Sequence, residues 1–522
     1  MKALRHRAVL SLLAVAAGAM ALTSCIDERT VYEPRPIYEE PEAAALEFVG
    51  YTDAEDKLTV CGNCHIGQQS EWEETAHAFA WDGLQTSDHA QAFCEGCHTV
   101  NSLGNLMVEE TPGTAEGGWA AVAEERYHDV QCESCHGAGL PHIQNPDALD
   151  TRPMAPIEVG TDLSFGCGEC HSGGHHPFVE EWENSPHGNM QAYPAGREET
   201  EGGCYFCHSG EGALQKWGVK ADYLEKETLL ASSEEFAHIT CAVCHDPHSN
   251  ENEGQLRFPV NTASTENHLC AQCHNRNDVP NPLSSHGLEP HAPEADLLIG
   301  GIGGVGWIPP GAEIGEDAIR GTHGSENNPR LCATCHVVAF SAMDTLTDTE
   351  VFSVGHGFRA IPCVENGLPT GGEDCALTVE ARNFDGCLGS GCHADATTAR
   401  GVLNSALVSL LDRVQELEEL LDVVDPNGSA AGGEIDGTNP TFTVAEGAWF
   451  NMHLAHHGTE FAPEMTRADS LLALAPSATH NPFLIETLLI TSIQAVEAEY
   501  SAVLADRRPT DPTPSLARPA GR

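Results

Sequence analysis

The sequence predicts a mainly α-helical fold with many loops, little β structure and long helices near its C-terminus. The first observation is a shortage of aromatic side chains, because 522 residues hold 16 Phe, 8 Tyr and 7 Trp but 21 Cys and 28 His. A chain of this length normally buries a large apolar core, so something other than side chains must fill part of this interior. The other observations are a recurring cysteine and histidine motif and leucines spaced by three and four after residue 400.

The recurring motif is Cys-x-x-Cys-His, which occurs eight times and is numbered here in chain order. Two thiols a short turn apart can each add to one vinyl group of a haem, and the adjacent histidine then lies under the iron. Zinc ribbons need no histidine after every second cysteine, and a thioredoxin-like site would occur once. The pattern therefore predicts eight covalently attached haems (haem c). The attachment residues of motifs 1 to 8 are Cys61, Cys64 and His65; Cys94, Cys97 and His98; Cys132, Cys135 and His136; Cys167, Cys170 and His171; Cys204, Cys207 and His208; Cys241, Cys244 and His245; Cys270, Cys273 and His274; and Cys332, Cys335 and His336.

A ninth motif has a wider spacing. Four residues separate Cys387 from Cys392, and His393 follows directly. The Gly-Ser-Gly insert could bulge outward and leave the two sulfurs in place, which predicts a ninth haem. The alternative is a structural disulfide beside an ordinary histidine. Besides Cys25, near the N-terminus, Cys363 and Cys375 then remain. They flank a loop rich in Gly and Pro, and a disulfide between them is the simplest interpretation in an oxidising compartment.

From Cys61 to His393 the chain resembles the bacterial multihaem c-type cytochromes of the outer-membrane or extracellular electron-transfer type. The widened motif 9 resembles a variant found in small tetrahaem cytochromes of sulfate-reducing bacteria. The resemblance implies a fold packed around its haems, which short helices and loops wrap. It also implies electron transfer through closely spaced haems, each with two axial histidines.

The second axial ligands would come from the 18 histidines that remain after the nine motif histidines and His6. His77 and His187 end similar Trp-x-x-x-x-His elements, which indicates an internal duplication. His480 opens a His-Asn-Pro element that resembles the terminal ligand of cytochrome c nitrite reductases and hydroxylamine oxidoreductases. A solvent-exposed or supporting role is the alternative for every candidate. The candidates are His77, His142, His176, His187, His248, His323, His356, His453 and His480.

The spacing of the motifs divides the chain into regions. Residues 1–24 have a positive start and a short apolar stretch before Leu-Thr-Ser-Cys25, which resembles a lipoprotein signal cut before that cysteine. The predicted regions are the signal peptide 1–24, a lipid anchor and acidic tether 25–50, a dense seven-haem domain 51–275, a sparser region 276–395 with haems 8 and 9, a C-terminal helical region 396–506 and a disordered tail 507–522.

The C-terminal region carries two apolar stripes. The first predicts a helix over 400–424, and a Gly-rich linker over 425–440 follows. A second long helix carries Leu489, Ile493, Val496, Tyr500 and Val503 at the same spacing. We interpret the pair as a helical hairpin that packs on the haem domain. The alternative is a contact between copies of the chain in a homo-oligomer or filament.

The net charge of −53 excludes nucleic acid as a partner, because phosphate binding needs clustered Lys and Arg. The leading hypothesis is an electron carrier without substrate chemistry of its own. It would be an exported outer-membrane lipoprotein of a Gram-negative-type bacterium, facing the periplasm or cell surface. Its partners would be other redox proteins or extracellular electron acceptors, and the membrane through lipidated Cys25. The alternative is an oxidoreductase that acts on a nitrogen or sulfur compound at one five-coordinate haem.

Overall fold

The computed structural model describes residues 45–507, all within one compact unit. The predicted signal, Cys25, most of the tether and all but residue 507 of the tail lie outside this range. None of the described helices is long and apolar enough to cross a membrane. The gaps in the description are 108–112, 158, 160–165, 174–175, 190–203, 220–236, 263, 265, 277, 283–286, 301–304, 316–320, 326, 373–374, 390–391, 427–431, 439–440 and 458–464.

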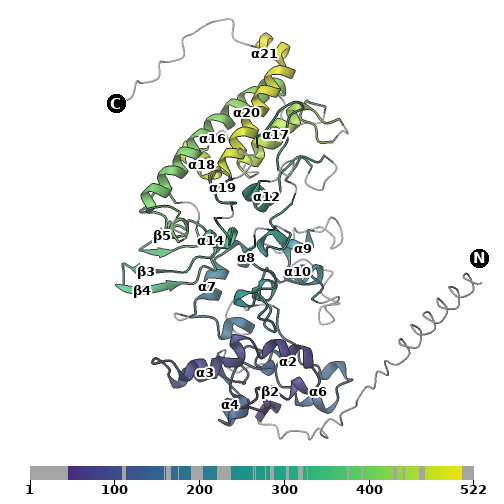
Figure 1. The fold of residues 1–522 in the computed structure, drawn as a ribbon, viewed down its shortest axis with the longest axis vertical. Helices are drawn as coiled ribbons and strands as arrows, with labels where there is room; N and C mark the ends of the chain where they lie inside the picture. Colours follow the sequence, from purple (N-terminus) through teal and green to yellow (C-terminus); the bar gives the residue numbers. More distant parts are fainter. Residues whose placement is uncertain are drawn as a thin grey trace, which may run out of the picture. The chain divides into compact units, whose positions relative to one another are not determined.

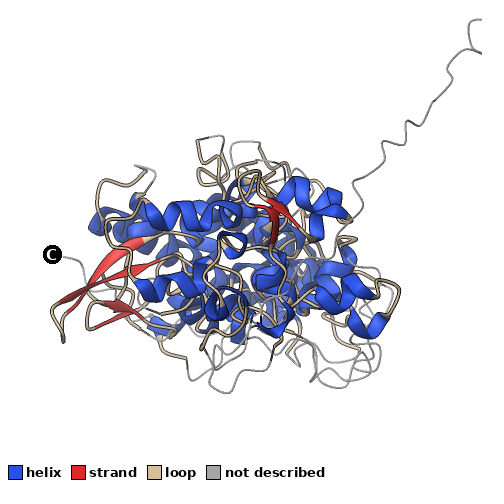
Figure 2. Cartoon of the chain, turned by 90° about the horizontal axis from the view of Figure 1, so that it is seen from below, coloured by secondary structure: helices blue, strands red, loops and turns tan. Residues whose placement is uncertain are grey.

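The prediction of a mainly α-helical fold with many loops and little β structure is confirmed (Figures 1 and 2). Residues 45–275 form short helices separated by loops. Their elements are η1 (Ala45–Glu47), β1 (Tyr51–Asp53), β2 (Leu58–Thr59), η2 (Cys61–Asn63), α2 (Ile66–Trp72), η3 (Ala76–Phe79), α3 (Ala80–Gln85), η4 (Ala92–His98), α4 (Gly118–Ala121), η5 (Glu125–Tyr127), α5 (Cys132–His136), α6 (Leu140–Gln144), η6 (Leu149–Thr151), η7 (Gly166–Glu169), α7 (Phe178–Glu183), α8 (Pro186–Asn189), α9 (Tyr205–His208), α10 (Gly210–Lys216), α11 (Cys241–Cys244), η10 (Glu253–Gln255) and η11 (Cys270–Gln272).

Glu133, inside motif 3, ties the start of the described chain to this region. Its buried carboxylate accepts hydrogen bonds from the backbone N–H groups of Val49 at 2.9 Å, Gly50 at 2.8 Å and Gly139 at 2.7 Å. Burial raises the pKa of Glu133 to about 7, although these donors favour the ionised form and act in the opposite direction.

Stability should therefore depend on the charge of Glu133. Its pKa is higher in the folded chain than in the unfolded one, so the folded state binds more protons between pH 4.5 and about 7. We expect the free energy of unfolding of the native protein to fall across this window relative to that of Glu133→Gln. Unfolding followed by circular dichroism at several pH values measures the difference. A difference that stays constant, or that grows with pH, would contradict the assignment.

Residues 276–395 hold motifs 8 and 9 and two of the three described two-stranded antiparallel sheets. Cys363 and Cys375 form the predicted disulfide. Residues 390–391 of the motif 9 insert lie outside the described residues. The elements are α12 (Glu294–Ile299), α14 (Cys332–His336), β3 (Phe340–Asp344), β4 (Thr349–Ser353), β5 (Val364–Glu365), β6 (Leu368–Pro369) and α15 (Asp385–Leu388).

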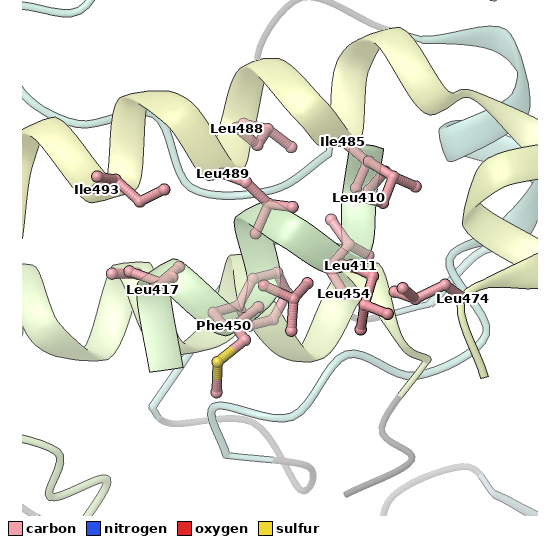
Figure 3. Close-up of a cluster of buried hydrophobic side chains, with 14 of the residues drawn as sticks. Leu410, Leu411, Leu417, Phe450, Leu454, Leu474, Ile485, Leu488, Leu489 and Ile493 are labelled. Atoms are coloured by element: carbon pink, nitrogen blue, oxygen red, sulfur yellow. The ribbon is translucent and has the colours of Figure 1, made fainter. Parts of the chain in front are cut away.

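The C-terminal region is a helical bundle with its own apolar core. The predicted first helix is α16 (Ala396–Val424), and it packs against α17 (Val444–Ala455) and α20 (Pro482–Glu499). Leu410 and Leu411 of α16 meet Leu454 and Ile485 in this core, and all four are almost completely buried (Figure 3). The stripe on α16 is thus covered within the chain itself. The remaining helices are α18 (Arg467–Ala473), α19 (Ala475–His480) and α21 (Ser501–Arg507).

Two details of this region differ from the sequence prediction. The second long helix ends at Glu499, and Val503 lies in α21 with 40% of its surface exposed, so it does not continue the apolar stripe. The predicted linker is partly folded against the bundle. The carboxylate of Asp425 accepts the backbone N–H of Ile435 at 2.8 Å, and Ile435 is buried in the core.

Candidate haem sites

Most motifs close into one short helical turn. In motif 1 the N–H of His65 donates to the carbonyl of Cys61 at 3.0 Å, and in motif 4 the N–H of His171 donates to Cys167 at 2.8 Å. An i to i+4 bond of this kind places the first cysteine, the second cysteine and the histidine on one side of the turn. The spacing of the motif is therefore what lets two thiols and an imidazole converge on one group.

A second histidine faces the motif histidine in eight of the nine motifs. The members of each pair come from segments far apart in the chain. In motif order, the distances between ring centroids are His65–His142 6.5 Å, His136–His248 6.1 Å, His171–His77 6.2 Å, His208–His291 5.9 Å, His245–His356 6.3 Å, His274–His187 6.2 Å, His336–His480 6.2 Å and His393–His323 6.2 Å.

These distances fit one iron between the two rings of each pair. Metal–imidazole bonds of about 2 Å, with half a ring on each side, place the centroids of two axial ligands about 6 Å apart. The thiols fit the same group, because all 18 motif cysteines are free of disulfides. Covalent attachment through two cysteines and ligation through two imidazoles can both be satisfied by the residues present.

Three of the paired imidazoles have a pKa that suits a metal ligand at neutral pH. Burial, reinforced by neighbouring histidines, lowers the pKa of His171 and His187 to about 4 and that of His480 to about 3. An imidazole with so low a pKa is neutral at pH 7 and keeps a nitrogen lone pair for a metal.

Of the nine histidines proposed from the sequence as second ligands, seven face a motif histidine in the structure. The other two, His176 and His453, do not form such a pair. His176 lies 6.3 Å from His171, on a motif histidine that already faces His77 at 6.2 Å. His453 stacks on Trp449 with centroids 3.5 Å apart, and its described contacts include no motif histidine. Sequence reasoning missed His291, which pairs with His208 from a proline-bearing loop that has no periodic spacing to reveal it.

Motif 2 is the exception to the pairing. Nδ1 of His98 lies 2.7 Å from the carbonyl oxygen of Ala80, and none of the described histidines pairs with its ring. The chain next to it carries three aromatic rings instead. Trp81 stacks on His128 at 4.1 Å and lies 4.9 Å from Trp119. An iron held by His98 would therefore have one axial position without a described imidazole.

Contacts between thiols of different motifs show which attachment sites are neighbours. Thiols that lie close enough to interact directly join motifs 1 and 3, 2 and 4, 4 and 6, 5 and 7, and 7 and 8. Three further pairs of motifs have thiols close enough to interact electrostatically: motifs 3 and 4, motifs 6 and 7, and motifs 8 and 9. Together these contacts define a trunk of motifs 1, 3, 4, 6, 7, 8 and 9, with motif 2 as a branch at motif 4 and motif 5 as a branch at motif 7.

One compact group of histidine and thiols belongs to this trunk. His268, Cys270 and Cys332 lie within 4.8 Å of one another, which would suit a metal ion in another protein. Here Cys270 and Cys332 are the first attachment thiols of motifs 7 and 8. The group is therefore a contact between two attachment sites.

The trunk contains a repeat that matches the predicted duplication. The indole of Trp72 donates to Val130 at 3.1 Å, just before motif 3, and that of Trp182 donates to Ile239 at 2.8 Å, just before motif 6. The histidine that follows each tryptophan element faces the motif histidine of motif 4 or of motif 7, respectively. The units 1–2–3 and 4–5–6 thus share one pattern, in which the middle motif is a branch and the other two belong to the trunk.

Comparisons with known proteins agree with this assignment. Residues 60–137 match the family described as "Cytochrome c554 and c-prime", and residues 235–279 match the one described as "Doubled CXXCH motif". The chain is a multihaem c-type cytochrome with covalently attached haem c.

Among curated proteins, the chain is similar to the C-type polyheme cytochrome OmcC of Geobacter sulfurreducens. The two are 29% identical over an alignment of 186 residues, and the match covers 30% of this chain and 23% of that relative. The chain therefore matches less than a quarter of the relative's length. No solved structure matches the chain. The likeness to this relative supports electron transfer in general terms.

Proposed function

We propose that this cytochrome is an electron conduit in which the trunk of seven motifs carries electrons along the chain. The observation that carries the proposal is the pairing of imidazoles at eight of nine motifs. Two histidines that fill both axial positions leave no place on the metal for a substrate. A site of that kind is suited to electron transfer and not to bond-making chemistry.

Different residues have different roles in binding the haems. Bound haem supplies reversible one-electron chemistry of its iron. The motif cysteines would attach each haem, and at eight motifs two imidazoles would hold its iron. Backbone carbonyls orient several of these rings, as Gly254 does for His245 at 2.7 Å and Phe358 does for His336 at 2.9 Å. Contacts between neighbouring motifs keep the attachment sites close.

The C-terminal bundle supports the far end of the trunk. His480, at the end of α19, faces the histidine of motif 8. The carbonyl of Thr479, one residue earlier, lies 2.6 Å from Nδ1 of His323, which faces the histidine of motif 9. One short helix therefore positions the second imidazole at two motifs. This gives the helical region a role in the proposed conduit.

We also propose that the protein is exported and anchored at the outer membrane through lipidated Cys25. The signal-like residues 1–25 support this location. A net charge of −53 would draw partners with positively charged docking surfaces, including other redox proteins. Such encounters should slow as salt screens the attraction.

Removing single haems distinguishes trunk from branch. The holoprotein would be immobilised on an electrode through its mature N-terminus and examined by voltammetry. The variant Cys94→Ala/Cys97→Ala removes branch motif 2, and we expect it to lose the current of one haem. The variant Cys167→Ala/Cys170→Ala removes trunk motif 4, and we expect it to lose, besides the current of that haem, the fast current of motif 2 and of motifs 5 to 9.

A haem count on each variant is the control, because both should retain eight haems. Equal losses of current in two correctly loaded variants would refute the trunk. A substrate-dependent catalytic current in the native protein would instead favour the oxidoreductase alternative.

A further inference from the structure

The carboxylate of Glu294 lies between two imidazoles. Its Oε2 is 3.3 Å from Nδ1 of His274, the histidine of motif 7, and its Oε1 is 3.4 Å from Nδ1 of His457. The backbone fixes this arrangement, because the N–H of Ala295 donates to the carbonyl of His274 at 2.9 Å. Glu294 is the first residue of α12, so that bond ties the helix start to the motif.

This partner differs in charge from those of other motif histidines. Nδ1 of His98, His245 and His336 faces the neutral backbone carbonyls described above, at 2.7 to 2.9 Å. Both carboxylate oxygens of Glu294 face an imidazole nitrogen that can donate a hydrogen bond, and hydrogen bonds to the charged form of a carboxylate favour that form. The partner of His274 is therefore a side chain that can carry a full negative charge, unlike a backbone carbonyl.

A negative charge at this position has a defined effect on a metal. An anionic acceptor on the second nitrogen makes an imidazole a stronger electron donor to the metal it binds. The charge also stabilises the oxidised, more positive iron relative to the reduced iron. Both effects lower the reduction potential of a haem that His274 holds.

We infer that Glu294 is a positioning residue that sets the haem of motif 7 at a lower potential than its own ligands alone would give. His457 holds the second carboxylate oxygen, and its ring lies 6.3 Å from that of His480, which faces the histidine of motif 8. The carboxylate thus connects the surroundings of two neighbouring motifs.

Motif 7 occupies a distinctive place in the row of attachment sites. Its thiols lie next to those of motif 8 and branch motif 5, and close enough to that of Cys244 in motif 6 to interact electrostatically. A haem of lowered potential at this junction would hold an electron only briefly. Electrons arriving along the trunk would then be distributed to motif 8 or motif 5. This consequence rests on the proposed conduit, whereas the potential of motif 7 does not.

The test is a spectroelectrochemical titration of the holoprotein and the variant Glu294→Gln, which keeps the size and one acceptor oxygen but removes the charge. We expect one of the nine components to move to a more positive potential. A tenfold rise in its ratio of reduced to oxidised iron at fixed potential corresponds to about 59 mV for one electron. The other components should stay within the error of the fit.

The matched control is Asp296→Asn, on the same helix. It removes the same charge two residues away, and its described side-chain contact is with Asp278 and not with a histidine. Equal shifts in both variants would show a general effect of charge and overturn the role of Glu294, as would no shift in Glu294→Gln. Glu294→Asp, which restores the charge, should return the component toward its native potential.

Two further readings keep the result unambiguous. A haem count must give nine in every variant. If Glu294→Gln loses a haem, the variant His457→Gln removes the other imidazole that faces the same carboxylate. It should also shift the potential of one component. Because these titrations are made at equilibrium, the potential can respond as expected even if the voltammetry of trunk and branch variants refutes the conduit. Failure of the two ideas is therefore distinguishable.

Discussion

In the fully oxidised holoprotein, one haem should be high-spin and should bind cyanide, and it should be the haem attached at Cys94 and Cys97. The reason is that His98 is the motif histidine without a paired imidazole among the described residues. The eight motifs that have a pair of imidazoles should give low-spin iron that cyanide leaves unchanged. EPR spectra before and after addition of cyanide measure both classes.

Two variants assign the signal. Cys94→Ala/Cys97→Ala should remove the high-spin signal and the cyanide response together. His480→Ala, which opens an axial position at motif 8, should add a second signal of the same kind. A native spectrum that is entirely low-spin would show that a sixth ligand reaches motif 2. His128 is then the first residue to substitute, because it lies in the aromatic cluster beside that motif.

The attachment residues could be predicted from the sequence because their chemistry is local. Two thiols and an imidazole within one helical turn must be close in sequence to be close in space, and the turn of motif 1 shows how. The helix over 400–424 was equally predictable, because apolar residues spaced by three and four lie on one face of a helix. This region is α16 in the structure, and its leucines at that spacing are buried on one face.

The second imidazoles could be predicted only in part, because tertiary contacts choose them. His77 lies next to motif 1 in sequence yet faces the histidine of motif 4. His291 has no spacing signal, and His453 shares a helix with Trp449, which covers its ring. Because the chain has more histidines than nine haems need, the sequence suggested a second imidazole for every motif. The number of histidines does not fix their positions, and no described imidazole faces the ring of His98. The order of motifs along the trunk depends on contacts between segments and has no local signature.

The substitution Leu411→Ala should destabilise the C-terminal bundle by about 3 to 5 kcal/mol, the cost of removing a large side chain from a packed core. Leu411 is fully buried between α16 and the helices that pack on it (Figure 3). Hydrogen exchange measured by mass spectrometry reports on this region separately from the haem-rich segments. An effect of this size should speed exchange in α16 and α20 by about a hundredfold or more, at 1.4 kcal/mol for each factor of ten.

The matched control is Val402→Ala, on the same helix with 57% of its surface exposed, which should change stability by no more than about 0.5 kcal/mol. The same experiment tests whether the bundle matters to the haems. Because α19 packs on α16 and presents His480, a loosened core should weaken the second ligand at motif 8. We therefore expect Leu411→Ala to acquire a partial high-spin signal that Val402→Ala lacks. Faster exchange with an unchanged EPR spectrum would mean that α19 is held mainly by motifs 8 and 9, and that the bundle stabilises the chain without tuning its cofactors.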